Sequence, residues 1–414
     1  MGGGPGRGAG EKGLRVLLTG GGTGGHIYPA LAIAAELRRR LPGCELLYVG
    51  TRDGLESRIV PRAGLPFATV SARGLMRKGP REVVAGVLAL TRGFLQADRI
   101  LARFRPQVVV GTGGYVAAPV ALAAVRRRIP VLIQEQNAVP GATNRLLARW
   151  ADAVCVPFAE AARFFPPRAR VVVTGNPVRP EILQARRHEA RARLGIAAGA
   201  RVVLVTGGSR GADRINRAAL ELAAALAATE RAVLLWACGE RYHPEMAARL
   251  RQRLRGAGAG PARAGAGAAG TPGGPGVTGS AEPGGRIRLF PYIDDMPAAY
   301  AAADLYVGRA GATTLAEITA RGLPAVLIPS PHVAHHEQDH NARVLEQAGA
   351  ALVIPDAELT GERLAGVVAD LLAAPARLEA MAAASRRLGR PDALDAIVDR
   401  VLALAGARPG VRGE

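Results

Sequence analysis

The chain has 414 residues, of which 49% are hydrophobic and only 4% aromatic, and it carries a formal net charge of +20. This length predicts two domains of ordinary size, and the composition predicts cores built from Ala, Val and Leu. The charge indicates an anionic partner (phosphate-bearing substrates, an acidic membrane surface or nucleic acid), while the three scattered cysteines, Cys44, Cys155 and Cys238, exclude a disulfide framework or a cysteine-based zinc site.

The N-terminal segment, residues 1–13, has no apolar core, so we expect a disordered tail rather than a secretory signal. One uncharged run, residues 108–125, approaches the length of a membrane span. Three glycines and Pro119 interrupt it. We therefore interpret the run as a strand, a glycine loop and a helix, and expect no transmembrane helix.

The first motif is "RVLLTGGGTGGHIYPALAIAAEL", an apolar strand followed by glycines and a helix. Glycines there let backbone N–H groups approach a ligand, and a helix N-terminus favours negative charge, so the motif predicts a phosphate or sugar site. Gly20, Gly22 and Gly25 also satisfy the dinucleotide pattern G-x-G-x-x-G. That pattern expects an acidic residue at the end of the second strand, where Gly50 and Thr51 stand instead. A dinucleotide site is therefore disfavoured.

Short apolar runs alternate with helical patterns along the whole chain, which predicts βαβ units and parallel sheets. In the first half we expect strands at Arg15–Thr19, Glu45–Val49, Phe67–Val70, Gln107–Val110, Val131–Ile133, Ala153–Val156 and Val171–Val173, with clear helices at Pro29–Arg40 and Val116–Arg128. In the second half we expect strands in "RVVLVT" and at Val233–Trp236, Ile287–Phe290, Leu305–Val307, Ala325–Ile328 and Ala351–Val353.

Composition also suggests the domain limits. Prolines and a glycine interrupt the pattern at residues 175–180, so we expect an N-terminal domain at 14–175 and a C-terminal domain at 176–392. Residues 256–285 are rich in Gly, Ala and Pro and predict a flexible surface insertion. A helix at Ala393–Leu404 is expected to pack back onto the N-terminal domain, with the tail ending at 414. A cleft between two such domains is where a ligand is expected.

Four glycine-bearing strand ends, "TGGGTGGH", "GTGGY", "TGGSRGA" and "GRAGATTLAE", predict loops that bind a phosphorylated ligand. In the last of them Thr313 and Thr314 can cap a helix whose free N–H groups hold a pyrophosphate without a metal. Glu317 lies one turn further, either on the hydroxyls of a ribose or as a solvated helix residue.

The segment "HVAHHEQDHNA" contains the zinc-protease pattern H-E-x-x-H at His336, Glu337 and His340, with Glu358 or Glu362 downstream as a third ligand. Its place after a sheet strand in a βαβ rhythm favours another interpretation, in which Gln338 and Asn341 face a sugar from the start of a helix. Both remain open on the pattern alone.

Two further segments have alternative interpretations. Glu135, Gln136 and Asn137 follow a strand and are either a hydroxyl-binding set or an ordinary polar loop. The segment from Arg73 to Phe104 places Leu75, Met76, Val83, Val84, Val87, Leu88 and Phe94 among Arg73, Arg77, Lys78, Arg81 and Arg92. It is either an anionic-membrane face or a core-facing helix with a solvated basic side.

Eight motifs in order, "GGTGGHIYPALAIA", "GTGGYVAAP", "QEQNAVPGATN", "GNPVR", "GGSRGA", "PYIDDM", "RAGATTLAEI" and "HHEQDHNA", resemble the MurG family of glycosyltransferases (glycosyltransferase family 28). The resemblance runs from about Leu14 to Leu404 without the insertion. It implies an α/β protein of GT-B fold, with two Rossmann-like, doubly wound parallel-sheet domains facing a central cleft. It also implies an enzyme that moves N-acetylglucosamine from UDP-GlcNAc to undecaprenyl-pyrophosphoryl-MurNAc-pentapeptide in peptidoglycan synthesis.

The resemblance also implies site residues. Those expected to bind the donor are Thr23, Gly24, Gly25, Asn137, Arg179, Ser209, Ile293, Ala312, Thr313, Thr314, Leu315, Ala316, Glu317 and Gln338. Glu317 is implied to hold the ribose, Ile293 to contact the uracil through its backbone, and Gln338 to read the sugar. The sequence departs from the family at Arg210, usually glutamine, and at Ala310, commonly serine.

The implied reaction is inverting, with the 4-hydroxyl of the acceptor sugar as nucleophile. His26, expected to titrate near neutrality, is our first choice of base and Glu135 our second; both, with Tyr115, are expected on the acceptor side. No D-x-D pair stands near the expected donor site, so neither a metal ligand nor a cofactor is expected.

The implied partners are the two substrates, an anionic membrane surface on the cytoplasmic side and other cell-wall synthesis proteins, without nucleic acid. A metal-dependent hydrolase, a non-catalytic nucleotide-sugar or nucleic-acid binder and a UDP-sugar epimerase of related architecture remain alternatives.

Overall fold

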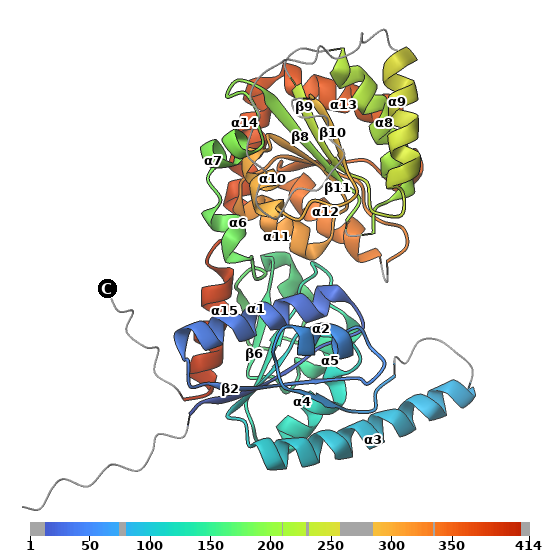
Figure 1. Ribbon diagram of the computed structural model, residues 1–414. Coiled ribbons are helices and arrows are strands. Elements are labelled where there is room, and N and C mark those ends of the chain that lie inside the picture. The colour runs from blue at the N-terminus through green and yellow to red at the C-terminus, as the bar shows by residue number, and fades with distance from the viewer. Residues whose placement is uncertain are drawn as a thin grey trace, which may run out of the picture. The chain divides into compact units, whose positions relative to one another are not determined.

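The computed structural model describes residues 13–73, 80–208, 210–228, 232–256, 285–333 and 336–406, with only the backbone for residues 80–84 and 256. The chain divides into two compact units (Figure 1), one made of Met1–Pro177 with Asp392–Glu414 and the other of Val178–Pro391. Nearly all of the predicted N-terminal tail and of the predicted insertion, together with Ser209 and the run from Leu75 to Lys78, lie outside the described residues.

The first unit is built on a seven-stranded sheet of order β3-β2-β1-β4-β5-β6-β7, in which every pairing is parallel. Its strands are β1 (Arg15–Thr19), β2 (Glu45–Gly50), β3 (Phe67–Thr69), β4 (Val108–Gly111), β5 (Val131–Gln134), β6 (Ala153–Val156) and β7 (Val171–Val173). Its helices are α1 (Gly24–Arg40), α2 (Glu56–Arg62), α3 (Pro80–Phe104), α4 (Ala117–Arg126), α5 (Ala142–Leu147), the 3₁₀ helix η1 (Ala159–Phe164) and α15 (Ala393–Leu404).

Both faces of this sheet are covered by helices, which explains the uninterrupted apolar strands. In β1, Val16 and Leu18 pack into a cluster with α1, α2 and α15. The residue between them, Leu17, packs on the other face with α3, α4 and α5. Successive side chains of a strand point to opposite faces, so each apolar strand contributes to two cores.

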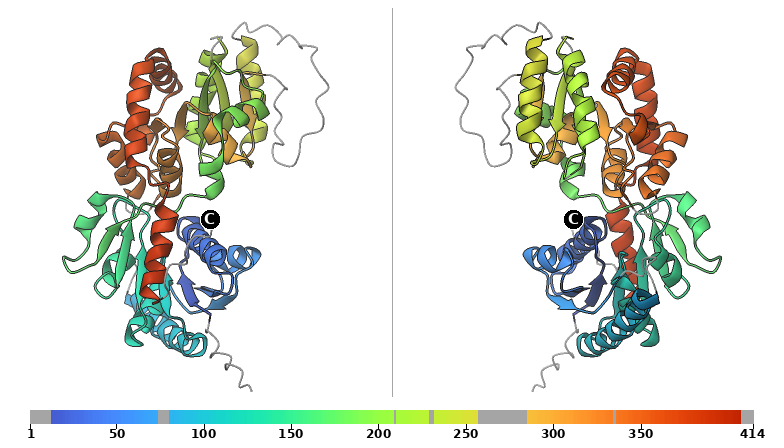
Figure 2. Two further views of the ribbon diagram at one scale, coloured as in Figure 1. Left: turned by 90° about the vertical axis from the view of Figure 1, so that its left-hand side faces the viewer. Right: turned by 90° about the vertical axis from the view of Figure 1, so that its right-hand side faces the viewer.

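The C-terminal helix α15 belongs to this first unit, although the whole second unit separates it from α1 in the sequence (Figures 1 and 2). Ile397 and Val401 are fully buried in the cluster shared with α1. At the rim, Arg40 of α1 makes ion pairs with Asp395 and Asp399 of α15. Apolar burial therefore holds this helix, and the ion pairs fix its orientation.

The second unit is built on a six-stranded parallel sheet of order β10-β9-β8-β11-β12-β13. Its strands are β8 (Arg201–Thr206), β9 (Ala232–Ala237), β10 (Ile287–Phe290), β11 (Leu305–Gly308), β12 (Ala325–Leu327) and β13 (Ala351–Val353). Its helices are α6 (Pro180–Gln184), α7 (Arg187–Arg193), α8 (Asp213–Ala227), α9 (His243–Gly256), α10 (Met296–Ala302), α11 (Ala312–Ala320), α12 (Glu337–Gln347), η3 (Asp356–Glu358), α13 (Gly361–Ala373) and α14 (Pro375–Leu388).

Its main core lies between the sheet and helices α8, α9, α13 and α14, and includes Trp236 of β9. The indole is fully buried, and its Nε1–H donates to Oδ1 of Asn216 on α8 at 3.1 Å. The Asn216 amide in turn donates to the Cys238 carbonyl at 2.8 Å. The indole N–H of Trp236 thus has a hydrogen-bond acceptor inside a core that otherwise consists mainly of aliphatic side chains.

The predicted fold class is confirmed, and every expected strand exists to within two residues at either end. Helix α1 begins at Gly24 rather than Pro29, since the glycine loop itself forms its first turn and Pro29 is accommodated inside it. Cys44 lies before β2, Cys155 within β6 and Cys238 after β9, and all three cysteines are free. Within the described ranges, no helix is long and apolar enough to cross a membrane.

Candidate functional site

The loops of the first unit that carry predicted site residues all leave the sheet at one edge. They follow β1 (Gly20–Thr23), β4 (Thr112–Tyr115) and β5 (Glu135–Pro140), and the carboxyl ends of parallel strands share an edge. The Gly21 N–H donates to the Gly113 carbonyl at 3.3 Å, and the Gln136 amide donates to the Thr112 carbonyl at 2.8 Å. The three loops therefore form one surface.

Two glycines of "GTGGY" are explained by the close approach of the loop after β4 to the loop after β1. Gly113 and Gly114 both have positive φ, of 107° and 79°. A Cβ on Gly114 would lie 2.3 Å from the Gly21 carbonyl oxygen, and one on Gly113 would lie 2.8 Å from Cδ2 of His26. Any side chain at either position would push the loop after β4 away from the loop after β1.

His26 lies in the first turn of α1, with its ring against the Gly113 backbone. Its Nδ1 is 3.3 Å from Oγ1 of Thr23, and its carbonyl accepts a hydrogen bond from the Thr112 hydroxyl at 2.7 Å. Burial lowers the pKa of His26 to about 4, and the nearby charge of Glu56 opposes the shift. Our expectation of titration near neutrality is corrected: the imidazole is neutral at pH 7.

Glu56 is a site residue that sequence reasoning missed. Its carboxylate is completely buried at the start of α2 and accepts hydrogen bonds from the backbone N–H of Gly22 and from both the N–H and hydroxyl of Thr51. It thereby fixes the glycine loop in front of His26. The segment "TRDGLESRIV" matches no motif that would mark Glu56 as a site residue. The available signal was that the glycine loop has many N–H groups in need of an acceptor, which a nearby carboxylate can supply.

Glu135 is buried beneath the loop that follows β5. One carboxylate oxygen accepts from the N–H groups of Gln136 and Asn137 at 2.9 Å, and the other accepts from the Gly141 N–H at 3.1 Å and the Asn144 amide at 2.8 Å. Burial raises the pKa of Glu135, and these hydrogen bonds act against the increase. Each carboxylate oxygen therefore already accepts two hydrogen bonds. This geometry indicates that Glu135 holds the loop rather than receiving a proton.

The remaining predicted residues of the first unit lie around the same loops. Thr23 and Gly25 are exposed at the start of α1, with Gly24 half-buried between them. Asn137 and Tyr115 are half-buried, and a Cβ on Gly22 would lie 3.4 Å from Cε1 of the Tyr115 ring. The edge therefore offers backbone amides, a histidine, a phenol and an amide side chain together, which suits a ligand with hydroxyl and phosphate groups.

In the second unit the corresponding edge carries the N-terminus of α11. Gly311 is its N-cap, in extended conformation, and no side chain caps the helix. The expected cap by Thr313 or Thr314 is therefore wrong, because both residues are inside the first turn. An uncapped N-terminus leaves the N–H groups of Ala312, Thr313 and Thr314 available to a ligand and directs the positive end of the helix dipole at it. Leu315 is buried and Ala316 half-buried on the following turn.

Glu317 and Arg179 form an ion pair at this edge. Arg179 Nε lies 2.9 Å from Oε1 of Glu317; the Glu317 side chain is 5% exposed, whereas that of Arg179 is 52% exposed. Burial and the neighbouring Glu317 carboxylate contribute to raising the pKa of the buried Tyr300 phenol well above its usual value. Glu317 is thus a buried side chain oriented by its contact with Arg179, and a solvated helix residue is excluded.

Gln338 lies in the first turn of α12, and its Oε1 accepts from the Ser330 N–H at 2.9 Å, which fixes the orientation of the amide. Asn341, which we expected to face a sugar beside Gln338, is instead buried, and its amide donates to the Ala310 carbonyl at 3.4 Å. His336 precedes α12 with φ of 52°, so it does not share a helical face with His340. Among the described residues, no three His, Cys, Asp or Glu side chains are grouped to hold a metal.

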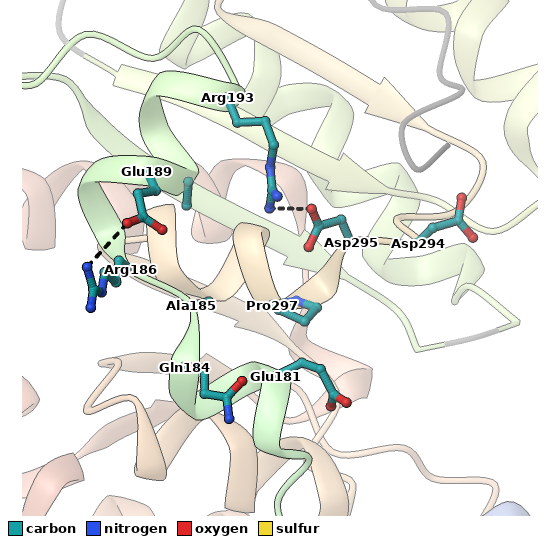
Figure 3. Close-up of a pocket in the computed structure, with 10 residues that line it drawn as sticks. Glu181, Gln184, Ala185, Arg186, Glu189, Arg193, Asp294, Asp295 and Pro297 are labelled. Carbon is teal, nitrogen blue, oxygen red and sulfur yellow. Dashed lines mark ion pairs between the residues drawn. The ribbon is translucent and has the colours of Figure 1, made fainter. Parts of the chain in front are cut away.

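Ile293 lies in the loop between β10 and α10, half-buried beside Phe290 and Ala299. The next residues of this loop border an open hollow next to α6, α7 and α10 (Figure 3). There Asp295 accepts from the Ala298 N–H at 3.0 Å as the N-cap of α10 and pairs with Arg193 of α7, while Arg186 pairs with Glu189. The two contacts of Asp295 hold the end of the loop and thereby help to position the Ile293 backbone.

The two departures from the family pattern have different surroundings. Arg210 is exposed, next to Ser209, which lies outside the described residues. Ala310 is fully buried before Gly311, and its carbonyl is held by Asn341. A hydroxyl at position 310 is therefore not needed to hold this loop.

The first unit also presents a mixed apolar and basic helix surface on α3. Leu88, Arg92, Leu95 and Arg99 are exposed and recur at helical spacing, so they form one stripe; the leucines are 59% and 54% exposed. The buried residues Ala97 and Leu101 lie on the opposite side of the helix. Figure 1 shows α3 running along the outside of this unit, which leaves the stripe to solvent.

Two all-parallel doubly wound sheets, each with glycine loops and a helix N-terminus at its carboxyl edge, define the GT-B class of α/β proteins. The N-terminal domain of glycosyltransferase family 28 matches residues 16–156, and the C-terminal domain of that family matches residues 275–397. The chain belongs to glycosyltransferase family 28.

Individual relatives agree with this assignment. The chain is 47% identical over 393 residues, 95% of its length and 99% of the relative's, to a UDP-N-acetylglucosamine–N-acetylmuramyl-(pentapeptide) pyrophosphoryl-undecaprenol N-acetylglucosamine transferase of Desulforudis audaxviator. It is 47% identical over 389 residues, 94% of this chain and 98% of the relative, to the protein of the same name from Moorella thermoacetica.

Among solved structures, MurG of Acinetobacter baumannii superposes with a TM-score of 0.72 at 30% identity, covering 94% of this chain and 99% of that one. A UDP-GlcNAc 2-epimerase of Neisseria meningitidis, bound to UDP-GlcNAc, superposes with a TM-score of 0.61 at 15% identity, covering 94% of this chain and all of that one. The latter likeness shows the fold alone.

Proposed function

We propose that the protein is an inverting glycosyltransferase that moves N-acetylglucosamine from UDP-GlcNAc to the 4-hydroxyl of the MurNAc sugar in undecaprenyl-pyrophosphoryl-MurNAc-pentapeptide. The observation that carries the proposal is the 47% identity, over nearly the whole length of both chains, to transferases whose name states this reaction. The low identity to the epimerase gives that alternative no comparable support.

UDP-GlcNAc is assigned to the carboxyl edge of the second unit. The free N–H groups at the start of α11 would hold the diphosphate, and the Glu317 carboxylate, oriented by Arg179, would accept from the ribose hydroxyls. Gln338, oriented by Ser330, would donate to the sugar, and the backbone at Ile293 would contact the uracil. Asn137 and Thr23–Gly25 are assigned to the donor as well, and Ser209 keeps its predicted role outside the described residues.

Bond cleavage would leave negative charge on the departing UDP. Amides that are already aimed at the diphosphate stabilise this charge without reorganisation, and the positive end of the α11 dipole adds to the effect. The helix terminus that supplies this stabilisation is held in place by the buried residues Leu315 and Ile318 behind it.

The acceptor hydroxyl must lose a proton as it attacks. His26 is our choice for the base, because it is neutral at pH 7 and its Nδ1 contacts the Thr23 hydroxyl, which sets the orientation of the ring. An anionic pyrophosphate bound nearby would raise its pKa and make it a stronger base. Tyr115 is assigned to the acceptor sugar, and Glu135 to holding the loop.

A lipid-linked acceptor requires the enzyme to reach a membrane. The stripe on α3, in which Leu88 and Leu95 alternate with Arg92 and Arg99, is assigned to the anionic surface on the cytoplasmic side. Other cell-wall synthesis proteins remain proposed partners without a surface assigned to them.

The test is the release of UDP from UDP-GlcNAc with and without a lipid-linked MurNAc-pentapeptide acceptor, with the lipid product identified by mass spectrometry. We expect UDP release only with the acceptor, and a product heavier by one N-acetylhexosamine. Release of free GlcNAc without acceptor would indicate a hydrolase, and appearance of an isomeric UDP-sugar would indicate an epimerase.

A further inference from the structure

A second cavity of the Val178–Pro391 unit lies at the edge of the sheet opposite to the α11 N-terminus. Its lining includes Arg201 at the beginning of β8, Asp304 immediately before β11 and Pro324 immediately before β12, so it lies where these parallel strands begin. Helix α14 closes the other side. The cavity has a volume of about 280 Å³, and the loops of this unit that are proposed to bind UDP-GlcNAc leave the other ends of the strands.

The charged residues that line this cavity are mostly arginines. They are Arg187, Arg201, Arg321 and Arg386, with only Asp304 and Glu379 of opposite sign. Asp304 accepts a hydrogen bond from Arg187 at 2.6 Å and lies 3.7 Å from the Arg201 guanidinium. It also pairs at 2.8 Å with Arg191, which does not line the cavity. One buried carboxylate is thus shared by three guanidinium groups, and the cavity keeps an excess of positive charge.

Arg321 and Arg386 have no acidic partner within 4 Å among the residues that the structure describes. Arg321 donates only to the Leu183 carbonyl, at 3.3 Å, and its Nε is buried without an acceptor. Burial and the charge of Arg187 lower the pKa of Arg321. The stem of Arg386 packs over Gly322, where a Cβ would lie 2.3 Å from its Cγ. An unsatisfied buried donor beside like charges is unfavourable unless an anion supplies acceptors.

We propose that this cavity binds a small soluble phosphate-class anion, held by Arg321 and Arg386 with Arg187 and Arg201 around it. Guanidinium groups are suited to this task because their planar N–H pairs match phosphate oxygens two at a time. The volume accommodates phosphate or pyrophosphate together with water. The site is independent of the proposed transferase reaction, since it shares no residue with the assigned donor site.

The test is a calorimetric titration of pyrophosphate into the full-length protein, saturated with UDP and in phosphate- and sulfate-free buffer. We expect one further binding event in the wild type. Arg386→Gln and, separately, Arg321→Gln should weaken it at least about tenfold, the effect of losing one or more charge-assisted hydrogen bonds. Arg387→Gln is the matched control: it makes the same change on the neighbouring residue of α14, which does not line the cavity, and should leave the affinity unchanged.

The variants separate the possible outcomes. Equal pyrophosphate affinity in Arg386→Gln and Arg387→Gln, or no binding event in the wild type, would overturn the proposal. Binding of the variants to anionic vesicles should match the wild type; if Arg386→Gln reduced vesicle binding and left pyrophosphate binding intact, the cavity would hold a lipid headgroup instead. Because the pyrophosphate affinities of Arg386→Gln and Arg387→Gln are compared under the same UDP saturation, the difference between them does not depend on where UDP binds.

Discussion

The Nε of Arg179 donates to Oε1 of Glu317 at 2.9 Å, which joins the segment just after the unit boundary to the second turn of α11. The pair is asymmetric, because the carboxylate is buried and the guanidinium is half exposed. The buried partner therefore has a defined orientation before any ligand arrives, held by Arg179 and by a hydrogen bond with the Tyr300 side chain.

Replacement of Glu317 by Gln should weaken UDP binding about tenfold or more, since a charge-assisted hydrogen bond to a ribose hydroxyl is lost together with the ion pair to Arg179. The measurement is the Kd of UDP by calorimetry. Glu189→Gln, an exposed glutamate of α7 in the same unit, serves as the control and should bind UDP normally. Unchanged affinity in Glu317→Gln would remove this residue from the donor site.

Replacement of His26 by Ala should lower kcat by about 10²–10⁴, the usual contribution of a general base. The KM for UDP-GlcNAc should change little, because the donor is bound mainly by the second unit. Steady-state kinetics with the lipid-linked acceptor measures both constants. Near-normal turnover of the variant would exclude His26 as the base.

His26 should also make stability depend on pH. Its pKa is about 4 in the folded protein and 6.5 when exposed, so the unfolded chain binds more protons between these values. The contribution of His26 to the free energy of unfolding is therefore fully present above pH 6.5 and is lost as the pH falls towards 4. The loss from this group is about 3 kcal/mol. Denaturant midpoints of wild type and His26→Gln, compared at pH 7.5 and 4.5, should converge at low pH; a constant difference would contradict the lowered pKa.

Glu135→Gln distinguishes a proton acceptor from a residue that holds the β5 loop. An amide would place an N–H group against backbone N–H donors, so we expect a loss of about 2–4 kcal/mol in the free energy of unfolding. The residual activity should keep the pH profile of the wild type. A profile that loses its acidic limb would instead identify Glu135 as the base.

The stripe on α3 predicts how the protein binds membranes. Leu88→Ser and Leu95→Ser should each weaken binding to anionic vesicles about tenfold, from the loss of about 1.5 kcal/mol or more of apolar burial. Arg92→Gln with Arg99→Gln should reduce the salt dependence of binding. Leu146→Ser, an exposed leucine of α5, is the control. Vesicle sedimentation at two salt concentrations measures both effects.

The sequence predicted the strands well because both faces of each sheet are buried, so every strand is a nearly unbroken apolar run, and several of the strands are followed by glycine loops. It could not show which N–H groups those glycines leave free, and this is why the helix cap was placed at Thr313 or Thr314 instead of Gly311. The pattern could not reveal Glu56 either, whose role depends on α2 returning to the β1 loop. Nor could it show that Glu135 and Asn341 are occupied with the backbone, since that depends on tertiary contacts.

The decisive measurement is a crystal structure of the protein with UDP-GlcNAc bound. The diphosphate oxygens should accept hydrogen bonds from the N–H groups of Ala312 to Thr314, with a ribose hydroxyl on Glu317. A diphosphate bound elsewhere, for example at the glycine loop of residues 20–25 alone, would contradict the account.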